Sequence, residues 1–218
     1  MRNFNGNFLP ESIEESLSLR SALIIWDMQK GIAPRVNEMA GIVDMIGKLR
    51  VAASERAAPT SFSQHYSIPL RWEARGYVHS RWMQSGRKSP DEMELLMPFG
   101  GTKMQFVDGL APGDDDIVLP KIRASFFFGT PLLSILKSCQ IETLILTGVA
   151  TDKGILATAR DANMLGIFPV VVSDATGAFS ELDHEFGLEA ARQVGQVVSV
   201  SECLELWRHR SQRRNASL

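Results

Sequence analysis

"ETLILTGVATDKGILATARDAN", residues 142–163, runs from an apolar stretch directly into an amphipathic one. The first part is apolar at consecutive positions, which is typical of a parallel strand that is covered on both faces. The second part has the apolar spacing of a helix. Many α/β enzymes place a nucleophile at such a strand-to-helix junction, yet no cysteine or serine stands at the predicted helix start.

The same alternation of short apolar runs and longer amphipathic runs extends along the chain. It predicts a single domain over residues 1–218, built as an α/β doubly wound parallel sheet in a Rossmann-like three-layer α/β/α arrangement. In such sheets, ligands bind beyond the carboxyl ends of the strands. The predicted strands are 21–27, 58–63, 116–119, 142–149, 168–174 and 196–201, and the predicted helices are about 36–55, 130–139, 152–165, 181–194 and 201–212.

Composition narrows the classes of partner. The formal net charge is −2 and no basic block stands out, so we expect no nucleic acid partner. No run reaches the length of a membrane span and the N-terminus lacks a signal-peptide core, so we expect no membrane partner and a cytoplasmic location. The two cysteines, Cys139 and Cys203, form no CxxC or Cys/His cluster, which argues against a disulfide framework or a zinc site.

Residues 64–115 interrupt the alternation. This stretch carries tryptophans, tyrosines and arginines, with a Gly/Pro-rich turn, MPFGG. Because so long a connection in a compact domain usually carries function or is disordered, we expect a folded lid or a contact between subunits.

Three polar residues fall at the carboxyl ends of predicted strands. Asp27 ends the first strand, His65 follows the second and Lys121 follows the third. Each has an ordinary interpretation, as a capping carboxylate or a solvated side chain. Together they would place an acid, a cation and a helix N-terminus at one edge of the sheet.

Four stretches then point to a family: WDMQ with Asp27, KIRASFFFGTPL with Lys121, TGVATDKGILATARDANMLG, and VVVSDATGAF. In this order and spacing the chain resembles the isochorismatase-like cysteine hydrolases, over about residues 20–205. The resemblance implies that Asp27 is the general acid/base and that Lys121 orients and stabilises charge. The family's nucleophilic cysteine would stand at Gly154, and Cys139 lies in the preceding helix as a packing residue.

True isochorismatases share this glycine, and the chain resembles them further in Gln64 and in GAFSELDHE (177–185). Their reaction cleaves a vinyl ether and releases pyruvate, so no nucleophilic side chain is needed. By this resemblance we expect hydrolysis of a small anionic substrate, with isochorismate as the best single guess. Gly154 would leave room for substrate against the helix N-terminus, and Gln64, His65, Ala150 and Thr151 are the expected binding residues.

Two alternatives remain open from the sequence. The chain is an amidase-type cysteine hydrolase that acts on C–N bonds and lost its cysteine at position 154, or it is a non-catalytic binding protein on the same fold. Whether Asp27 acts as an acid or only as a base also stays open, because burial raises a carboxyl pKa whereas a neighbouring Lys121 lowers it.

The remaining expectations concern partners and local geometry. Some family members hold a metal through a D-x-H motif, but the matching stretch here is Ser63-Gln64-His65, so we expect no metal, and we expect no cofactor. The resemblance also implies a non-proline cis peptide between Val149 and Ala150, and a homo-oligomer, either dimer or tetramer. Asp174 is expected to cap a helix or fix a loop.

Overall fold

A six-stranded parallel sheet forms the centre of the molecule. The computed structural model describes residues 1–215. The strand order is β5-β4-β3-β6-β7-β8, which is the order of a Rossmann-like doubly wound sheet, so the predicted fold class is confirmed. The strands are β3 (Ser21–Trp26), β4 (Thr60–His65), β5 (Ile117–Lys121), β6 (Thr143–Val149), β7 (Phe168–Gly177) and β8 (Gln196–Val198).

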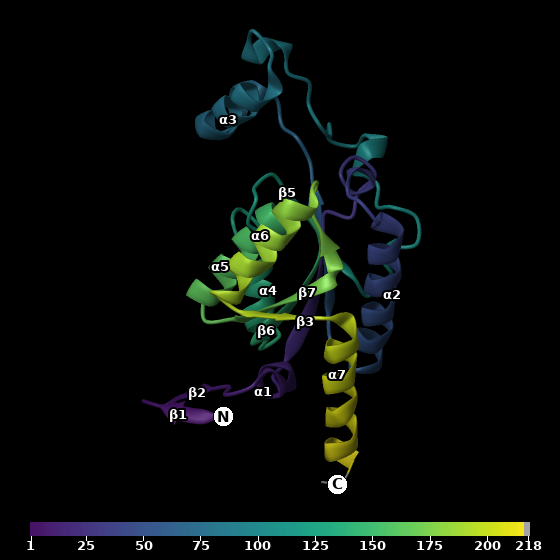
Figure 1. Ribbon diagram of the computed structural model, residues 1–218, viewed down its shortest axis with the longest axis vertical. Helices are drawn as coiled ribbons and strands as arrows, with labels where there is room; N and C mark the ends of the chain where they lie inside the picture. Colours follow the sequence, from purple (N-terminus) through teal and green to yellow (C-terminus); the bar gives the residue numbers. More distant parts are fainter. Residues whose placement is uncertain (216–218) are drawn as a thin grey trace.

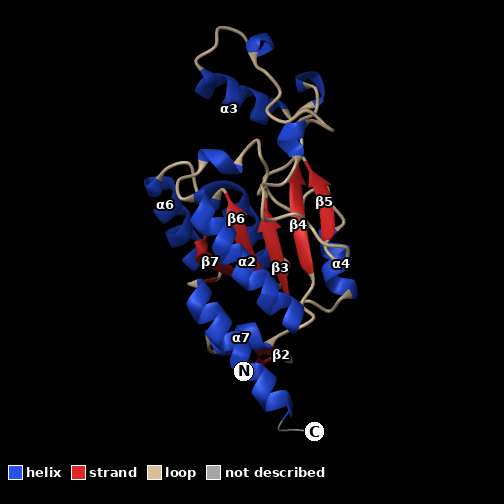
Figure 2. Ribbon diagram, turned by 90° about the vertical axis from the view of Figure 1, so that its right-hand side faces the viewer, coloured by secondary structure: helices blue, strands red, loops and turns tan. Residues whose placement is uncertain are grey.

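Helices cover both faces of this sheet. Figure 1 shows α2 (Met39–Glu55) and α7 (Val200–Asn215) on one side, and the remaining three crossover helices on the other. Figure 2 shows the sheet more nearly face-on, with its strands pointing toward α3. The three helices of the second layer are α4 (Leu132–Ser138), α5 (Leu156–Met164) and α6 (Glu181–Arg192).

The core is divided by the sheet into two apolar clusters, as the two-residue period of a strand requires. In β3, Leu23 and Ile25 belong to the cluster under α2 and α7, whereas Ala22 and Ile24 belong to the cluster under α4 and α5. All six residues of β3 and all seven of β6 are buried. This explains the consecutive apolar runs in the sequence, because these central strands have no solvent-facing side.

Several predicted boundaries shift. The second strand starts at Thr60 rather than at residue 58 and continues to His65, and the last ends at Val198 rather than at 201. A π-helical turn, Thr151–Ile155, precedes α5 where the sequence predicts one continuous helix from 152. Residues 216–218 of the predicted single domain lie outside the described part of the chain.

Four elements were not predicted. They are the hairpin strands β1 (Arg2–Phe4) and β2 (Asn7–Leu9), and the helices α1 (Ile13–Ser18) and α3 (Arg75–Ser85). Signals for the first three exist: Asn5-Gly6 is a typical hairpin turn, and the Ser12 hydroxyl caps α1 by accepting a hydrogen bond from the Glu15 amide.

The long connection between β4 and β5 is folded, and its part around α3 stands apart from the sheet, whereas Val107 and Leu110 near its end pack into the core. Figure 1 shows α3 well beyond the carboxyl ends of the strands. No residue of α3 is buried, and Trp72 and Phe99 nearby expose 69% and 74% of their surface. Within residues 1–215, no helix has the length and apolar character needed to cross a membrane.

Candidate functional site

The carboxyl ends of the central strands bring the predicted residues together. Asp27 directly follows β3, while His65 and Lys121 are the last residues of β4 and β5 and pair with each other in the sheet register. Trp26 pairs with Gly148 of β6, and the π-helical turn with Gly154 begins just beyond that strand. This is the point where the strand order reverses, which is where doubly wound sheets bind ligands.

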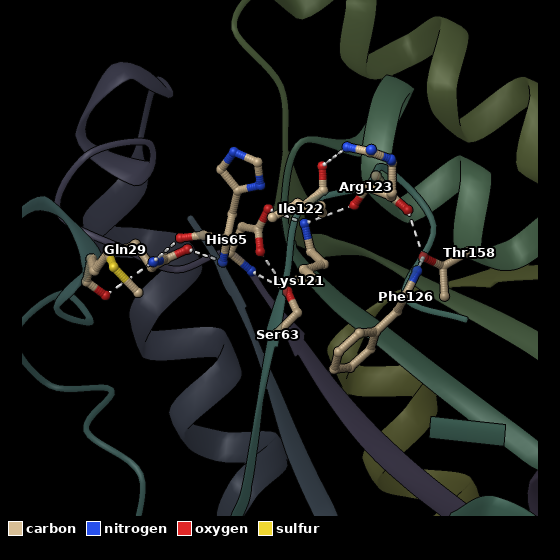
Figure 3. A network of polar contacts seen from close by, with 11 residues as sticks. Gln29, Ser63, His65, Lys121, Ile122, Arg123, Phe126 and Thr158 are labelled. Atoms are coloured by element: carbon tan, nitrogen blue, oxygen red, sulfur yellow. Dashed lines mark hydrogen bonds and ion pairs between the residues drawn. The ribbon is translucent and has the colours of Figure 1, made fainter. Parts of the chain in front are cut away.

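Asp27 and Lys121 form a buried ion pair. Lys121 Nζ lies 2.7 Å from Asp27 Oδ2, and the two side chains are 2% and 8% exposed for Lys121 and Asp27 respectively. The Ser63 hydroxyl donates to Asp27 Oδ1 at 2.6 Å and accepts from the Asp27 amide at 3.0 Å (Figure 3). Both carboxylate oxygens therefore accept a hydrogen bond, the arrangement of an ionised aspartate.

Burial also changes the acidity of the Lys121 ammonium. Desolvation lowers the pKa of Lys121 from its ordinary value, and the Asp27 carboxylate opposes that shift without cancelling it. The ammonium donates a further hydrogen bond to the Arg123 carbonyl at 3.2 Å. Lys121 is thus a fully paired cation whose proton is held less tightly than that of a lysine in water.

The Trp26 side chain fills the space above Gly154. A Cβ atom built on Gly154 would lie 2.1 Å from Trp26 Nε1, which is far inside van der Waals contact. The indole is held between Lys121, whose Nζ lies 4.1 Å from the ring centroid, and Phe126, whose ring packs edge-on at 5.4 Å. The room expected for substrate over this glycine is therefore taken by protein.

Position 148 must also be glycine because of a close approach, in this case by the Trp26 backbone. Its φ of 102° lies in the region that favours glycine, and a Cβ there would lie 2.2 Å from the Trp26 carbonyl oxygen. The two strands can approach at this register only with glycine at position 148. This fixes the distance between Trp26 and the helix that begins beyond β6.

The expected binding residues on β4 take two different positions. The Gln64 side-chain amide donates to the Met104 carbonyl at 3.1 Å, so it ties the strand to the long connection. The His65 ring extends from the strand on the side of Lys121 opposite Ser63 (Figure 3). Burial, assisted by the positive charge of Lys121, lowers the pKa of His65 to about 4, so the ring is neutral at neutral pH.

The expected binding residues after β6 are buried. The peptide bond between Val149 and Ala150 is cis, as expected from the family resemblance. The Thr151 hydroxyl lies 2.8 Å from His184 Nδ1, so it is engaged within the protein. His184 belongs to the GAFSELDHE stretch, and burial lowers its pKa.

Sequence reasoning missed three residues that shape this site: Trp26, Gln29 and Ser63. Gln29 is fully buried, donates to the carbonyls of His65 and Met104, and accepts from the His65 amide at 2.8 Å. Two of the three stand in the WDMQ motif itself. Their residue types could have indicated a role in the site. A tryptophan beside a strand-end aspartate needs space for its ring, and a buried glutamine amide needs hydrogen-bond partners.

Other residues have structural roles. The Asp174 carboxylate accepts from the Val200 amide at 2.7 Å and so caps α7, as predicted. A hollow of about 450 Å³ between α2, the end of β7 and α6 is lined by His184 and Glu38 but by neither Asp27 nor Lys121. Among residues 1–215, no cluster of three or more His, Cys, Asp or Glu side chains is placed to hold a metal ion.

Comparison with known proteins shows that a family model and several named proteins match this chain. The family model described as "Isochorismatase domain" matches residues 21–203. The chain is 35% identical over 188 residues to "Ureidoacrylate amidohydrolase RutB" of Pseudomonas syringae pv. syringae, covering 79% of this chain and 74% of that protein. It is 32% identical over 189 residues to "Phenazine biosynthesis protein PhzD1" of Pseudomonas aeruginosa, covering 85% and 86%.

Solved structures share the fold. A cysteine hydrolase from Pseudomonas syringae pv. phaseolicola superposes with a TM-score of 0.73 at 23% identity, over 88% of this chain and 94% of that one. An isochorismatase family protein from Burkholderia thailandensis superposes with a TM-score of 0.71 at 25% identity, over 87% and 96%. The first of these likenesses bears on the fold alone.

Proposed function

Because this chain belongs to the isochorismatase family of hydrolases, we propose that it hydrolyses a small anionic substrate by acid–base chemistry, without a nucleophilic side chain. The proposed reaction is cleavage of the vinyl ether of isochorismate with release of pyruvate. Asp27 and Lys121 carry the chemistry in this proposal, and no cofactor is required. Free Cys139 and Cys203 are in keeping with a cytoplasmic location.

The observation that carries this proposal is the packing of Trp26 over Gly154. A hydrolase that had merely lost its cysteine would keep an empty space where the thiol had been. Here the indole occupies that space to within 2.1 Å of the missing Cβ. The packing therefore supports a site adapted to work without a side chain at position 154.

The chemistry can be followed from the two charged groups. In the resting pair of the proposed mechanism, Lys121 is the hydrogen-bond donor and Asp27 accepts from both Lys121 and Ser63. In the proposed reaction the Lys121 proton passes through Asp27 to the terminal carbon of the vinyl ether, and the lowering of the Lys121 pKa by burial favours its release. Water then attacks the oxocarbenium ion, its proton returns to the pair, and the hemiketal collapses to pyruvate and the ring alcohol.

Under this proposal, one of the predicted binding residues contacts substrate and the others support the pocket. His65 is the best placed to contact substrate, as a neutral imidazole beside the pair. Gln64 and Thr151 already have partners inside the protein. We propose that Gln64 and Thr151 support the pocket walls, and that the buried backbone at Ala150 and Gly154 closes the site from below.

A second candidate is C–N bond hydrolysis, favoured by the 35% identity to a protein named as a ureidoacrylate amidohydrolase. That reaction in a cysteine hydrolase would require a nucleophile that Gly154 lacks. A non-catalytic binding protein is the third alternative. It is disfavoured because a buried ion pair is often no more stabilising than apolar residues of the same volume.

The test is a side-by-side assay of the purified protein with isochorismate and with ureidoacrylate. We expect pyruvate from the first and no ammonia from the second, with pyruvate release lost in Asp27→Asn. Ammonia without pyruvate would support the C–N hydrolase, and no product from either substrate would refute the proposed reaction.

A further inference from the structure

A second ion pair lies next to the first. Arg123 follows Lys121 by two residues, and its carbonyl accepts the Lys121 ammonium. Its guanidinium Nη1 lies 2.5 Å from Glu73 Oε1, and Glu73 comes from the long connection just before α3. The Glu73 side chain is only 4% exposed, while that of Arg123 is 28% exposed.

His65 lies beside the first pair and within electrostatic reach of the second. The charges of Asp27, Lys121, Glu73 and Arg81 all act on its ring. Figure 3 shows the His65 ring and the Arg123 side chain on the same side of Lys121. The partly exposed guanidinium therefore belongs to a residue whose backbone is hydrogen-bonded to the proposed acid–base pair.

The charges of these groups cancel in pairs. Asp27 neutralises Lys121 and Glu73 neutralises Arg123, so neither cation is available to an anionic substrate as the pairs stand. The guanidinium is not saturated, however. Its hydrogen bonds to Glu73 and to the Ile122 carbonyl both come from Nη1. An arginine has five N–H donors in a fork that matches a carboxylate.

We propose that Arg123 binds a carboxylate of the substrate, and that Glu73 holds that position in the substrate-free protein. This inference rests on the proposed function, because it assigns the part of the site that recognises an anionic substrate. Asp27 and Lys121 then act on the vinyl ether while the carboxylate stays on Arg123. Glu73 is a positioning residue that must leave when substrate enters.

The helix that follows Glu73 can shift with little loss of packing, whereas the Glu73 carboxylate itself is buried and also accepts a hydrogen bond from the Ala74 amide. None of the residues of α3 is buried, so few apolar contacts are lost when this part of the connection shifts. The connection is anchored on both sides of this segment, where the Ser67 amide donates to the Met97 carbonyl at 2.7 Å. Displacement of Glu73 therefore does not require the whole connection to detach.

The two partners should respond in opposite directions, which separates this proposal from a merely structural ion pair. The probe is 3-hydroxybenzoate, with 3-hydroxybenzamide as its uncharged match, and binding is measured by calorimetry. Glu73→Gln should bind the benzoate more tightly than the native protein. Arg123→Met should bind it about tenfold or more weakly, the usual effect of losing a hydrogen bond to a charged group.

The matched control is Arg50→Met, since Arg50 and Asp116 form a comparably buried ion pair at 2.7 Å elsewhere. It should leave benzoate affinity unchanged, and none of the variants should change binding of the benzamide. The proposal is overturned if Glu73→Gln and Arg123→Met weaken benzoate binding alike, or if neither the native protein nor Glu73→Gln binds it. Because these measurements need no turnover, they stand apart from the pyruvate assay, which tests the reaction itself.

Discussion

At the scale of single residues, Asp27 and Lys121 depend on each other. Their charged atoms lie 2.7 Å apart and almost fully out of water. Removing one partner of a buried pair commonly costs about 3–5 kcal/mol, because the other charge is left without compensation. A change at either residue will therefore affect folding as well as chemistry, and the two effects have to be separated.

Asp27→Asn should lower kcat/KM by about 10²–10⁴-fold, the usual contribution of a positioned acid–base group. It should also lower the free energy of unfolding, because the Lys121 ammonium loses its partner. The double variant Asp27→Asn/Lys121→Met should regain stability in urea unfolding but no activity. A double variant less stable than both single variants would contradict the view of the pair as mutually dependent charges.

The pH dependence of the rate should show the acidity of Lys121. The proposed mechanism needs the ammonium, so kcat should be constant at lower pH and fall as pH rises through the Lys121 pKa. Because burial lowers that pKa, the fall should lie below the ordinary lysine value of 10.5. Lys121→Arg should have little activity and no such fall, since arginine stays protonated. An alkaline limb that is the same in both proteins would assign it to another group.

At the scale of elements, the site depends on how the ends of β3 and β6 meet. Trp26 pairs with Gly148, and its indole reaches over the π-helical turn to Gly154. The sequence predicts both strands, because each is a consecutive apolar run. It does not predict this contact, because the two residues belong to different strand-to-helix junctions and only the register brings them together. Asp27 and Lys121 were predictable since each stands at a strand end.

A double-mutant cycle tests the contact between these elements. Gly154→Cys alone should reduce the free energy of unfolding by about 1–3 kcal/mol, because the new side chain meets the buried indole. Trp26→Val alone should also destabilise, through the cavity it leaves. In the double variant the new thiol fills part of that cavity, so its loss of stability should be smaller than the sum of the single losses. Urea unfolding measures all four proteins, and simple additivity would show that the two positions do not share the space.

At the scale of the whole molecule, the long connection between β4 and β5 is the part that the sequence described least. It has no sustained apolar period, because its short helices turn few residues toward a core. Consequently α3, Glu73 and the ion pair with Arg123 could not be predicted, although the sequence did indicate a folded segment. The sheet was predictable because burial on both faces gives its central strands runs of consecutive apolar residues.

The exposed aromatic residues of this connection predict self-association. Trp72 and Phe99 are 69% and 74% exposed in this one connection, and large exposed apolar side chains of this kind commonly mark contacts between proteins. We expect sedimentation to give at least twice the 24.1 kDa chain mass, and Trp72→Ser/Phe99→Ser to shift the protein toward monomer. A native protein that is monomeric at micromolar concentration would contradict this expectation.

The central claim is that the protein hydrolyses its substrate without a nucleophilic thiol. The most direct measurement is pyruvate release from isochorismate before and after treatment with iodoacetamide. We predict the same rate in both, because Cys203 is fully buried with its pKa raised to about 12, and Cys139 lies at the end of α4, outside the site. Loss of pyruvate release on alkylation would contradict the account.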